Sequence, residues 1–376
     1  MASRRLRRLQ HGTAAALATA TLGLGLFAAP PAAANTSGSG SEPSSVVTQE
    51  ATSTPEEIRE FWTPERVREA LANPLPAPVA DPATGPAPAP ASTESSPTSA
   101  PEAQAVSADA VPPRDTSTGD PGAESIATTA AAPTVSRSVR VSNELAWPYR
   151  ATGKLIFETP KGTYNCSASV IVSNTKNAVW TAAHCLHGGK GGAFYKNFLF
   201  LPGYNGVTQY HWWVQDRVMV PTKWVDYSDH YSSDLGAIIV KKDLALGNLQ
   251  DFVGGYGYNF SDGPEHTDVH SFGYPFDGYN RPDSDFNGGE YMMYCRGNTV
   301  DGGNWDPLDE RLRMNCDMGH GSSGGPMVTG VAGGNIRIVG VNSHRNVDSN
   351  GNWSNNYLFS SEHASEARSL IYKING

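Results

Sequence analysis

From about Trp147 onwards, the sequence consists of short runs of β-branched and aromatic residues divided by Gly, Pro, Asn and Asp. Ten of these runs are typical of β-strands: 154–157, 167–172, 178–181, 198–201, 212–220, 235–240, 269–272, 291–295, 325–328 and 336–342. Many short strands separated by turn signals predict an all-β barrel or sandwich. Near the end, apolar residues recur at helical spacing over 364–371, after the candidate N-cap Ser361, and predict a C-terminal helix.

Three segments of this region carry residues with catalytic chemistry. His184 lies in Thr-Ala-Ala-His-Cys, Asp234 directly precedes an apolar run, and Ser323 lies in Gly-Ser-Ser-Gly-Gly-Pro. A serine hydroxyl becomes nucleophilic when an imidazole takes its proton, and the imidazole needs a buried carboxylate that fixes its tautomer. The glycines around Ser323 allow backbone N–H groups to point at a developing oxyanion. The pattern predicts a catalytic triad.

Each of these residues has competitors. His187 is the nearest other histidine, but it opens a Gly-rich loop, and Asp226, Asp229 and Asp243 do not directly precede the apolar run. The glycine-rich segment also fits a plain turn or a phosphate cradle. No Gly-Lys-Ser/Thr follows it, which disfavours the phosphate site.

At these residues the chain resembles the chymotrypsin-like serine peptidases, and it looks closest to the secreted bacterial branch that contains the glutamyl endopeptidases. The resemblance covers about residues 151–376. It implies two packed six-stranded antiparallel β-barrels with the active site between them, and no metal or organic cofactor. It also implies that His184 is the general base, Asp234 its orienting carboxylate and Ser323 the nucleophile. The backbone N–H groups of Gly321 and Ser323 would form the oxyanion hole.

The chain has four cysteines, Cys166, Cys185, Cys295 and Cys316. An even count in an exported chain favours disulfides, and the absence of a Cys-x-x-Cys pair disfavours zinc. Four cysteines allow three pairings. The resemblance implies Cys166–Cys185, which leaves Cys295–Cys316.

Substrate preference depends on residues near the nucleophile. The resemblance makes Ser343 a contact of the triad carboxylate and places Asp317 where the trypsin branch holds a pocket aspartate, which favours cleavage after Lys or Arg. The glutamyl branch has a histidine where this chain has Asn342, and His344 shares that strand face. Arg345 would then either neutralise Asp317 or favour acidic substrates. The alternative is that Asp317 merely caps a turn.

One residue departs from the animal digestive members of the family. They carry an aspartate before the nucleophile, which pairs with a new N-terminus, whereas this chain has Ser322. No Ile-Val-Gly-Gly start is present between residues 137 and 153. We therefore do not expect activation by that ion pair.

The N-terminal part predicts export and processing. Residues 1–34 combine an Arg-rich start, an apolar run and small residues before Asn35, as in a secretory signal peptide, with an uncleaved membrane anchor as the alternative. Residues 35–140 form a largely disordered pro-region or linker with short helices near 55–72, and the protease domain is expected at 141–376. The helical part either binds the folded protease or is a marginal helix in a tail.

Only 17% of the residues are charged and the net charge is −9, so a nucleic-acid role has no electrostatic support. We expect a secreted, extracellular, monomeric serine endopeptidase made as a zymogen. It would act on protein or peptide substrates and would have no stable membrane anchor. The alternatives are a non-catalytic secreted binding protein of the same family and an esterase. The strand-turn-helix context of an esterase nucleophile is absent.

Overall fold

The computed structural model describes residues 46–80, 106–114, 133–208, 210–260, 263–303, 309 and 311–376. The elements given below belong to one compact unit within residues 43–376. The predicted signal segment lies outside the described residues. So do residues 35–45, 81–105 and 115–132 of the predicted disordered pro-region.

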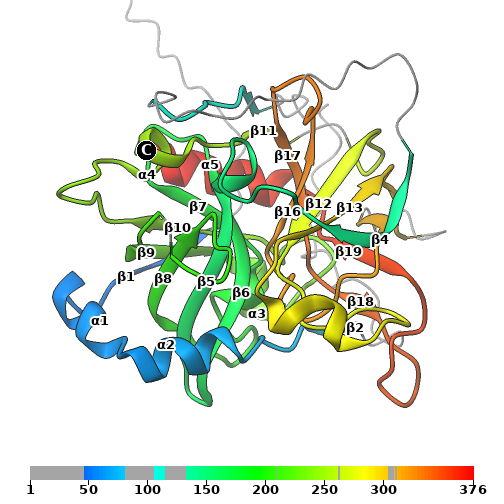
Figure 1. Cartoon of the computed structure of the whole chain (residues 1–376), viewed down its shortest axis with the longest axis horizontal. Coiled ribbons are helices and arrows are strands. Elements are labelled where there is room, and N and C mark those ends of the chain that lie inside the picture. Colours follow the sequence, from blue (N-terminus) through cyan, green and yellow to red (C-terminus); the bar gives the residue numbers. More distant parts are fainter. Residues whose placement is uncertain are drawn as a thin grey trace, which may run out of the picture. The chain divides into compact units, whose positions relative to one another are not determined.

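Six antiparallel strands close into the first barrel (Figure 1). Their hydrogen-bonded order is β9-β10-β7-β6-β5-β8, and β8 pairs with β9 to complete the ring. The strands are β5 (Thr152–Thr159), β6 (Gly162–Ile171), β7 (Ala178–Thr181), β8 (Lys196–Pro202), β9 (Trp213–Pro221) and β10 (Gly236–Val240). Trp180, Phe200 and Ile238 are at most 1% exposed, so bulky side chains fill this core. Burying each one contributes about 1.5–3 kcal/mol.

The second half of the fold is built from two further sheets. A seven-stranded sheet has the order β3-β11-β17-β16-β12-β13-β4, and a three-stranded sheet has the order β14-β15-β19. Their strands are β3 (Ser107–Ala108), β4 (Val135–Arg140), β11 (Gly257–Asn259), β12 (Val269–Gly273), β13 (Met293–Gly297), β14 (Val300–Asp301), β15 (Leu312–Asn315), β16 (Pro326–Thr329), β17 (Arg337–Val341) and β19 (Tyr357–Ser360). The N–H groups of Ser343 and Phe359 connect the two sheets by bonding to the carbonyls of Phe359 and His344.

The predicted all-β class is confirmed, with a closed six-stranded barrel, a second β unit and a C-terminal helix. All ten expected strands are present, whereas β3, β4, β11, β14, β15 and β19 of the second half were not predicted. In the described residues, the strands of the second half pair in two sheets and not in one closed ladder. The N-terminal strand β4 joins the larger of these sheets, because it pairs with β13.

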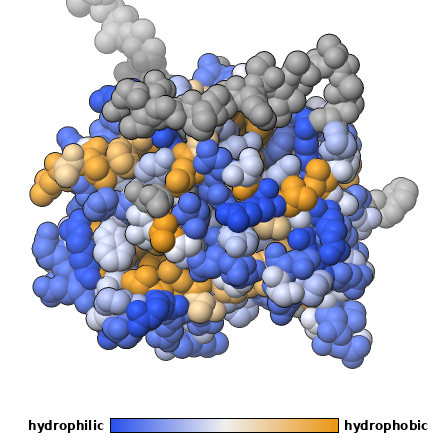
Figure 2. All heavy atoms as spheres, viewed as in Figure 1, coloured by the Kyte–Doolittle hydropathy of each residue, from blue (hydrophilic) through white to orange (hydrophobic). Residues whose placement is uncertain are grey.

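The remaining helices are short: α3 (Thr222–Tyr227), α4 (Leu249–Val253) and α5 (Ser365–Asn375). Ala364, not the predicted Ser361, occupies the N-cap of α5. No helix in the described part of the chain is both long and apolar enough to span a bilayer. Figure 2 shows a mainly hydrophilic face with scattered apolar patches, and the fully exposed Leu244 lies in the loop between β10 and α4.

The segment 46–80 packs along the first barrel (Figure 1). Strand β1 (Val46–Glu50) pairs with β9, and the helices α1 (Pro55–Phe61) and α2 (Pro64–Leu71) follow it. Thr54 and Glu57 form a capping box at α1, which satisfies backbone donors that the first turn leaves free. Trp62 is 3% exposed and donates to the Asn197 carbonyl at 2.6 Å, so the segment contributes to the packed core.

Candidate active site

His184 lies in a turn that follows β7. The chain enters the 3₁₀ turn η2 (Ala183–Cys185) there, and the small side chains of Ala182 and Ala183 are fully buried. Cys185 is bonded to Cys166 on β6, which ties the turn to the barrel. The fold therefore holds the imidazole in a fixed place.

Both expected disulfides, Cys166–Cys185 and Cys295–Cys316, are present. Replacing Cys166 and Cys185 by Ala is expected to lower the free energy of unfolding by about 3 kcal/mol, and also to lower kcat because the bridge positions His184. Replacing Cys295 and Cys316 is the matched control, since the sequence separations are 19 and 21 residues. Urea unfolding and peptide hydrolysis check both pairs. Equal losses of kcat would contradict a special role for the first bridge.

Asp234 lies two residues before the start of β10 and is hydrogen-bonded to the His184 imidazole. Its Oδ2 lies 2.8 Å from His184 Nδ1, and its Oδ1 accepts the His184 backbone N–H at 2.8 Å. Ser343 Oγ donates to Oδ2 at 2.5 Å, and Ser361 Oγ accepts the Asp234 N–H at 3.0 Å. Burial acts to raise the pKa of Asp234, but the charge and hydrogen bonds of His184 and the Ser343 hydroxyl hold that pKa below its usual range. The carboxylate stays charged and places the imidazole proton on Nδ1.

Ser323 lies in a sharp turn before β16. Gly321 has φ +89°, and a Cβ there would come within 2.6 Å of the Tyr274 carbonyl oxygen, so glycine is required. The N–H groups of Gly321 and Ser323 donate to no other described residue. The hydroxyl of Ser322 instead donates to the Gly319 carbonyl at 2.7 Å. Two backbone donors are thus left free beside the Ser323 hydroxyl.

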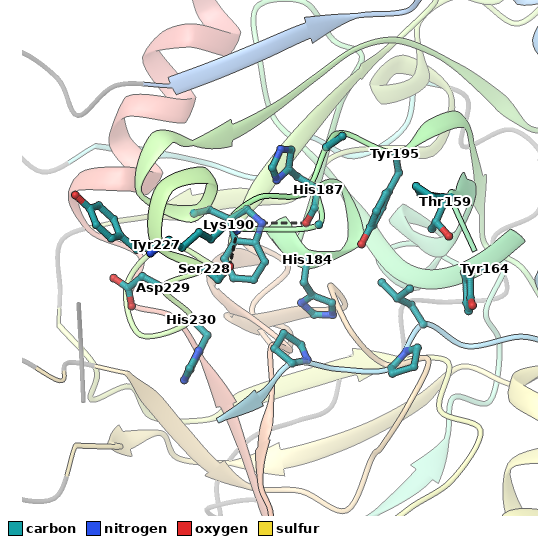
Figure 3. A pocket seen from close by; sticks show the side chains of 18 of the residues that line it. Thr159, Tyr164, His184, His187, Lys190, Tyr195, Tyr227, Ser228, Asp229 and His230 are labelled. Carbon is teal, nitrogen blue, oxygen red and sulfur yellow. Dashed lines mark hydrogen bonds between the residues drawn. The ribbon is translucent and has the colours of Figure 1, made fainter. Parts of the chain in front are cut away.

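Two cavities border these residues. His184 lines one of about 1010 Å³, and Ser323 lines one of about 90 Å³. Figure 3 shows the His184 ring in the larger cavity, between His230 and Tyr164 in this view. The Nε2 atom of His184 is buried and makes no hydrogen bond with any described residue, Ser323 included. This is the atom that would take a proton from a nucleophile.

Asp317 does not line the cavity at Ser323. Its Oδ1 accepts the Ser138 N–H at 2.8 Å, and its Oδ2 accepts Arg281 Nη1 at 3.0 Å. Both carboxylate oxygens are therefore engaged, and a neighbouring cation balances the charge. This placement corrects the prediction of a pocket for Lys or Arg, because the carboxylate faces Arg281 and not the cavity.

Asn342, Ser343 and His344 line the smaller cavity. The Asn342 amide donates to the carbonyls of Phe272 and Ser322 at 2.9 and 3.0 Å, so it holds the turn before the nucleophile. Both ring nitrogens of His344 are hydrogen-bonded inside the protein. Neither side chain has a free polar atom for substrate.

Among the described residues that line the smaller cavity, Arg345 is the one arginine, and none of the others is Lys, Asp or Glu. Its guanidinium lies 4.9 Å from the Trp353 ring centroid, and Nε donates to the Met318 carbonyl at 2.8 Å. Burial lowers the pKa of Arg345 to about 10, so the group remains a cation at neutral pH. Arg345 thus places a buried cation in the wall of this cavity, and its two terminal nitrogens donate to the carbonyls of Cys316, Asn355 and Tyr357.

Residues 73–80, here called the covering segment, cross both cavities. Leu75, Pro76 and Pro78 line the larger cavity, and Ala77 and Pro78 line the smaller one. Figure 3 shows this blue ribbon passing below His184. Backbone hydrogen bonds of 2.9 and 3.0 Å attach the segment to Asn165, and β2 (Val79–Ala80) pairs with β18 (Arg345–Asn346). Its Ala- and Pro-rich composition gave no signal of this position.

Comparison with solved structures defines the class of protein. The chain is 27% identical to the protease Anisep from Arthrobacter nicotinovorans, with a TM-score of 0.52 over 60% of this chain and 95% of that one. It is 26% identical to AL20, a thermostable serine protease from an extremophilic microorganism, with a TM-score of 0.50 over 60% and 97%. No protein-family model and no curated protein matches the sequence. The chain has the fold of the chymotrypsin-like serine proteases, and this likeness supports a peptidase activity.

Proposed function

We propose that this chain is a secreted serine endopeptidase that cleaves peptide bonds through His184, Asp234 and Ser323. One arrangement carries the proposal. The buried Asp234 carboxylate holds the Nδ1 face of His184, while Nε2 and the two N–H groups beside Ser323 make no bond to any described residue. A structural histidine has no need of such an arrangement, whereas a general base does.

The chemistry follows from these positions. Ser323 Oγ attacks the substrate carbonyl as His184 Nε2 takes its proton, and Asp234 stabilises the resulting imidazolium. The N–H groups of Gly321 and Ser323 stabilise the oxyanion, and each such donor contributes about 3 kcal/mol. His184 then protonates the leaving amine, and water hydrolyses the acyl-enzyme.

A fluorophosphonate probe tests this function. It is expected to label Ser323 covalently and to block cleavage of a folded protein substrate in proportion to labelling. Labelling without any cleavage of peptides, but with cleavage of simple esters, would favour an esterase. A chain that takes no label even after proteolytic nicking would be a non-catalytic binding protein.

We further propose that the enzyme prefers an acidic residue before the scissile bond. Arg345 lines the small cavity together with Ser323, and no carboxylate is among the described residues that line it. A substrate carboxylate would meet a cation there, whereas a substrate Lys or Arg would be repelled.

A peptide library is expected to show cleavage after Glu or Asp, and Arg345→Gln is expected to lower kcat/KM for those peptides by about 100-fold, since a charge-assisted hydrogen bond contributes 1.5–3 kcal/mol. Asp317→Asn is the control, because its carboxylate faces Arg281 and not the cavity. Cleavage after Arg that is lost in the Asp317 variant would restore the basic-pocket hypothesis.

We also propose that the covering segment keeps the enzyme inactive until it is cut away. It lies across the cavities of His184 and Ser323 and occupies the edge of β18, where an extended substrate would add as a strand. A signal peptide at 1–34 fits this function. In place of the predicted boundary at residue 140, we propose that the pro-region ends before Val135. Strand β4 belongs with the protease part, because it pairs with β13 and its Ser138 binds Asp317.

A further inference from the structure

A chain of hydrogen bonds leads away from the Asp234 carboxylate. Ser343 Oγ lies 2.5 Å from Asp234 Oδ2 and 2.8 Å from His344 Nδ1. The other ring nitrogen, Nε2, lies 2.8 Å from Arg311 Nη1. Arg311 is paired with Asp309 through Nε–Oδ1 at 2.7 Å and Nη2–Oδ2 at 2.6 Å. All five side chains are buried, so bulk water does not compete for these bonds.

The direction of every proton in this chain is determined. A guanidinium only donates, so His344 Nε2 must accept from Arg311. The neutral ring then carries its proton on Nδ1 and donates it to Ser343 Oγ. The single hydroxyl proton of Ser343 is left for Asp234. The ion pair at the far end therefore fixes which way the serine hydroxyl points.

The surroundings keep His344 neutral. Burial lowers the pKa of His344 well below its usual range, and the facing His230, Arg311 and His184 lower it further. Its ring stacks on Phe359 at 5.2 Å and meets His230 edge-on at 4.8 Å, so it has little room to turn. A doubly protonated His344 ring would carry a proton on Nε2 that faces the Arg311 N–H. The hydrogen bond between the two residues would then be lost.

Stability alone does not explain this arrangement. Burying an Arg–Asp pair costs desolvation energy that the attraction barely offsets, and apolar side chains of similar volume are often at least as stabilising. Arg311 donates one hydrogen bond to His344 besides those to Asp309. The last acceptor in this row of hydrogen bonds is the Asp234 carboxylate, which orients His184. The row of hydrogen bonds thus ends at Asp234 and His184 of the proposed triad.

We propose that His344 and Arg311 are positioning residues of the protease, which orient the Ser343 hydroxyl toward Asp234 and so keep that carboxylate charged and aligned with His184. The inference rests on the proposed function. Neither residue contacts substrate through its polar atoms, and both act through Ser343.

The tautomer of His344 is measurable without activity. In the full chain carrying Ser323→Ala, which prevents self-digestion, ¹⁵N-labelled histidine spectra are expected to show His344 as the neutral Nδ1–H form from about pH 5.5 to 8. His344→Asn identifies its signals by their loss. An Nε2–H tautomer, or protonation within this range, would overturn the proposal.

Kinetics of the chain after it has been cut within residues 81–105, normalised by fluorophosphonate titration, supply the second measurement. His344→Phe keeps the stacking ring but removes both hydrogen bonds, and kcat is expected to fall about tenfold with KM unchanged. His344→Asn keeps an amide donor near the Nδ1 position and is expected to recover most of the loss. His270→Phe is the control, because His270 is a buried histidine of β12 that takes no part in the hydrogen bonds between Asp234 and Asp309.

Two failures are distinguishable. A wild-type chain that takes no probe and cleaves no peptide, even after it has been cut within residues 81–105, would refute the proposed function, while the histidine spectra would still decide the tautomer. An active wild type whose His344→Phe variant keeps full kcat would refute the positioning role. Thermal unfolding midpoints identify any variant that fails to fold, and the His344 tautomer measured in Ser323→Ala then decides the proposal.

Discussion

Ser323→Ala is expected to abolish peptide hydrolysis, with a loss of kcat of about 10⁶-fold, because removal of the nucleophile leaves only binding and oxyanion stabilisation. The fold should be unchanged, since the Ser323 backbone carbonyl, and not its side chain, accepts the Ser167 N–H at 2.7 Å. Steady-state kinetics and the thermal unfolding midpoint of the variant check the two statements.

Ser322→Ala is the matched control for this experiment. The Ser322 hydroxyl is buried and donates to the Gly319 carbonyl, so its loss is expected to cost about 1 kcal/mol of stability while hydrolysis persists. The two serines are adjacent in sequence but have different partners. An active Ser323→Ala variant beside an inactive Ser322→Ala variant would show that the nucleophile is assigned to the wrong residue.

Cutting the chain between the covering segment and the protease is expected to raise activity about 100-fold. A recognition sequence for a specific protease inserted within residues 81–105 allows the cut. The covalent link holds the segment at a millimolar effective concentration, and this advantage ends when the link is cut and the sample is diluted. Hydrolysis of a small chromogenic peptide measures the change. A synthetic peptide of residues 46–80 is expected to inhibit the cut enzyme.

Two substitutions make this test specific. Leu75 is 9% exposed and lines the larger cavity, so Leu75→Ser is expected to raise the activity of the uncut chain. Ala72→Ser is the control, because Ala72 is exposed, lies three residues earlier and lines neither cavity. Equal activity of the cut and uncut chains, with no effect of Leu75→Ser, would refute the inhibitory role.

Local sequence patterns predicted those parts of the fold that depend on neighbouring residues. β-branched runs between turn residues predicted ten strands, because side-chain burial on alternating faces is encoded locally. β15 and β19 were missed: Met314 and Leu358 are buried in a core shared by strands distant in sequence, each strand has only four residues, and β19 shows no alternation of buried and exposed positions. The Ser361 hydroxyl bonds to Asp234 and His230, which no helix-capping pattern reveals.

By itself, the sequence determined the all-β class and the chemical groups of the site, because strand periodicity and motif residues are local properties. The tertiary structure alone decided what surrounds those groups. Asp317 faces Arg281, 36 residues away, so the charge beside the nucleophile cavity is that of Arg345. Likewise, only the packing of β15 against β19 brings Arg311 to His344. Such contacts depend on which strands pair, and strand pairing is a property of the whole folded chain.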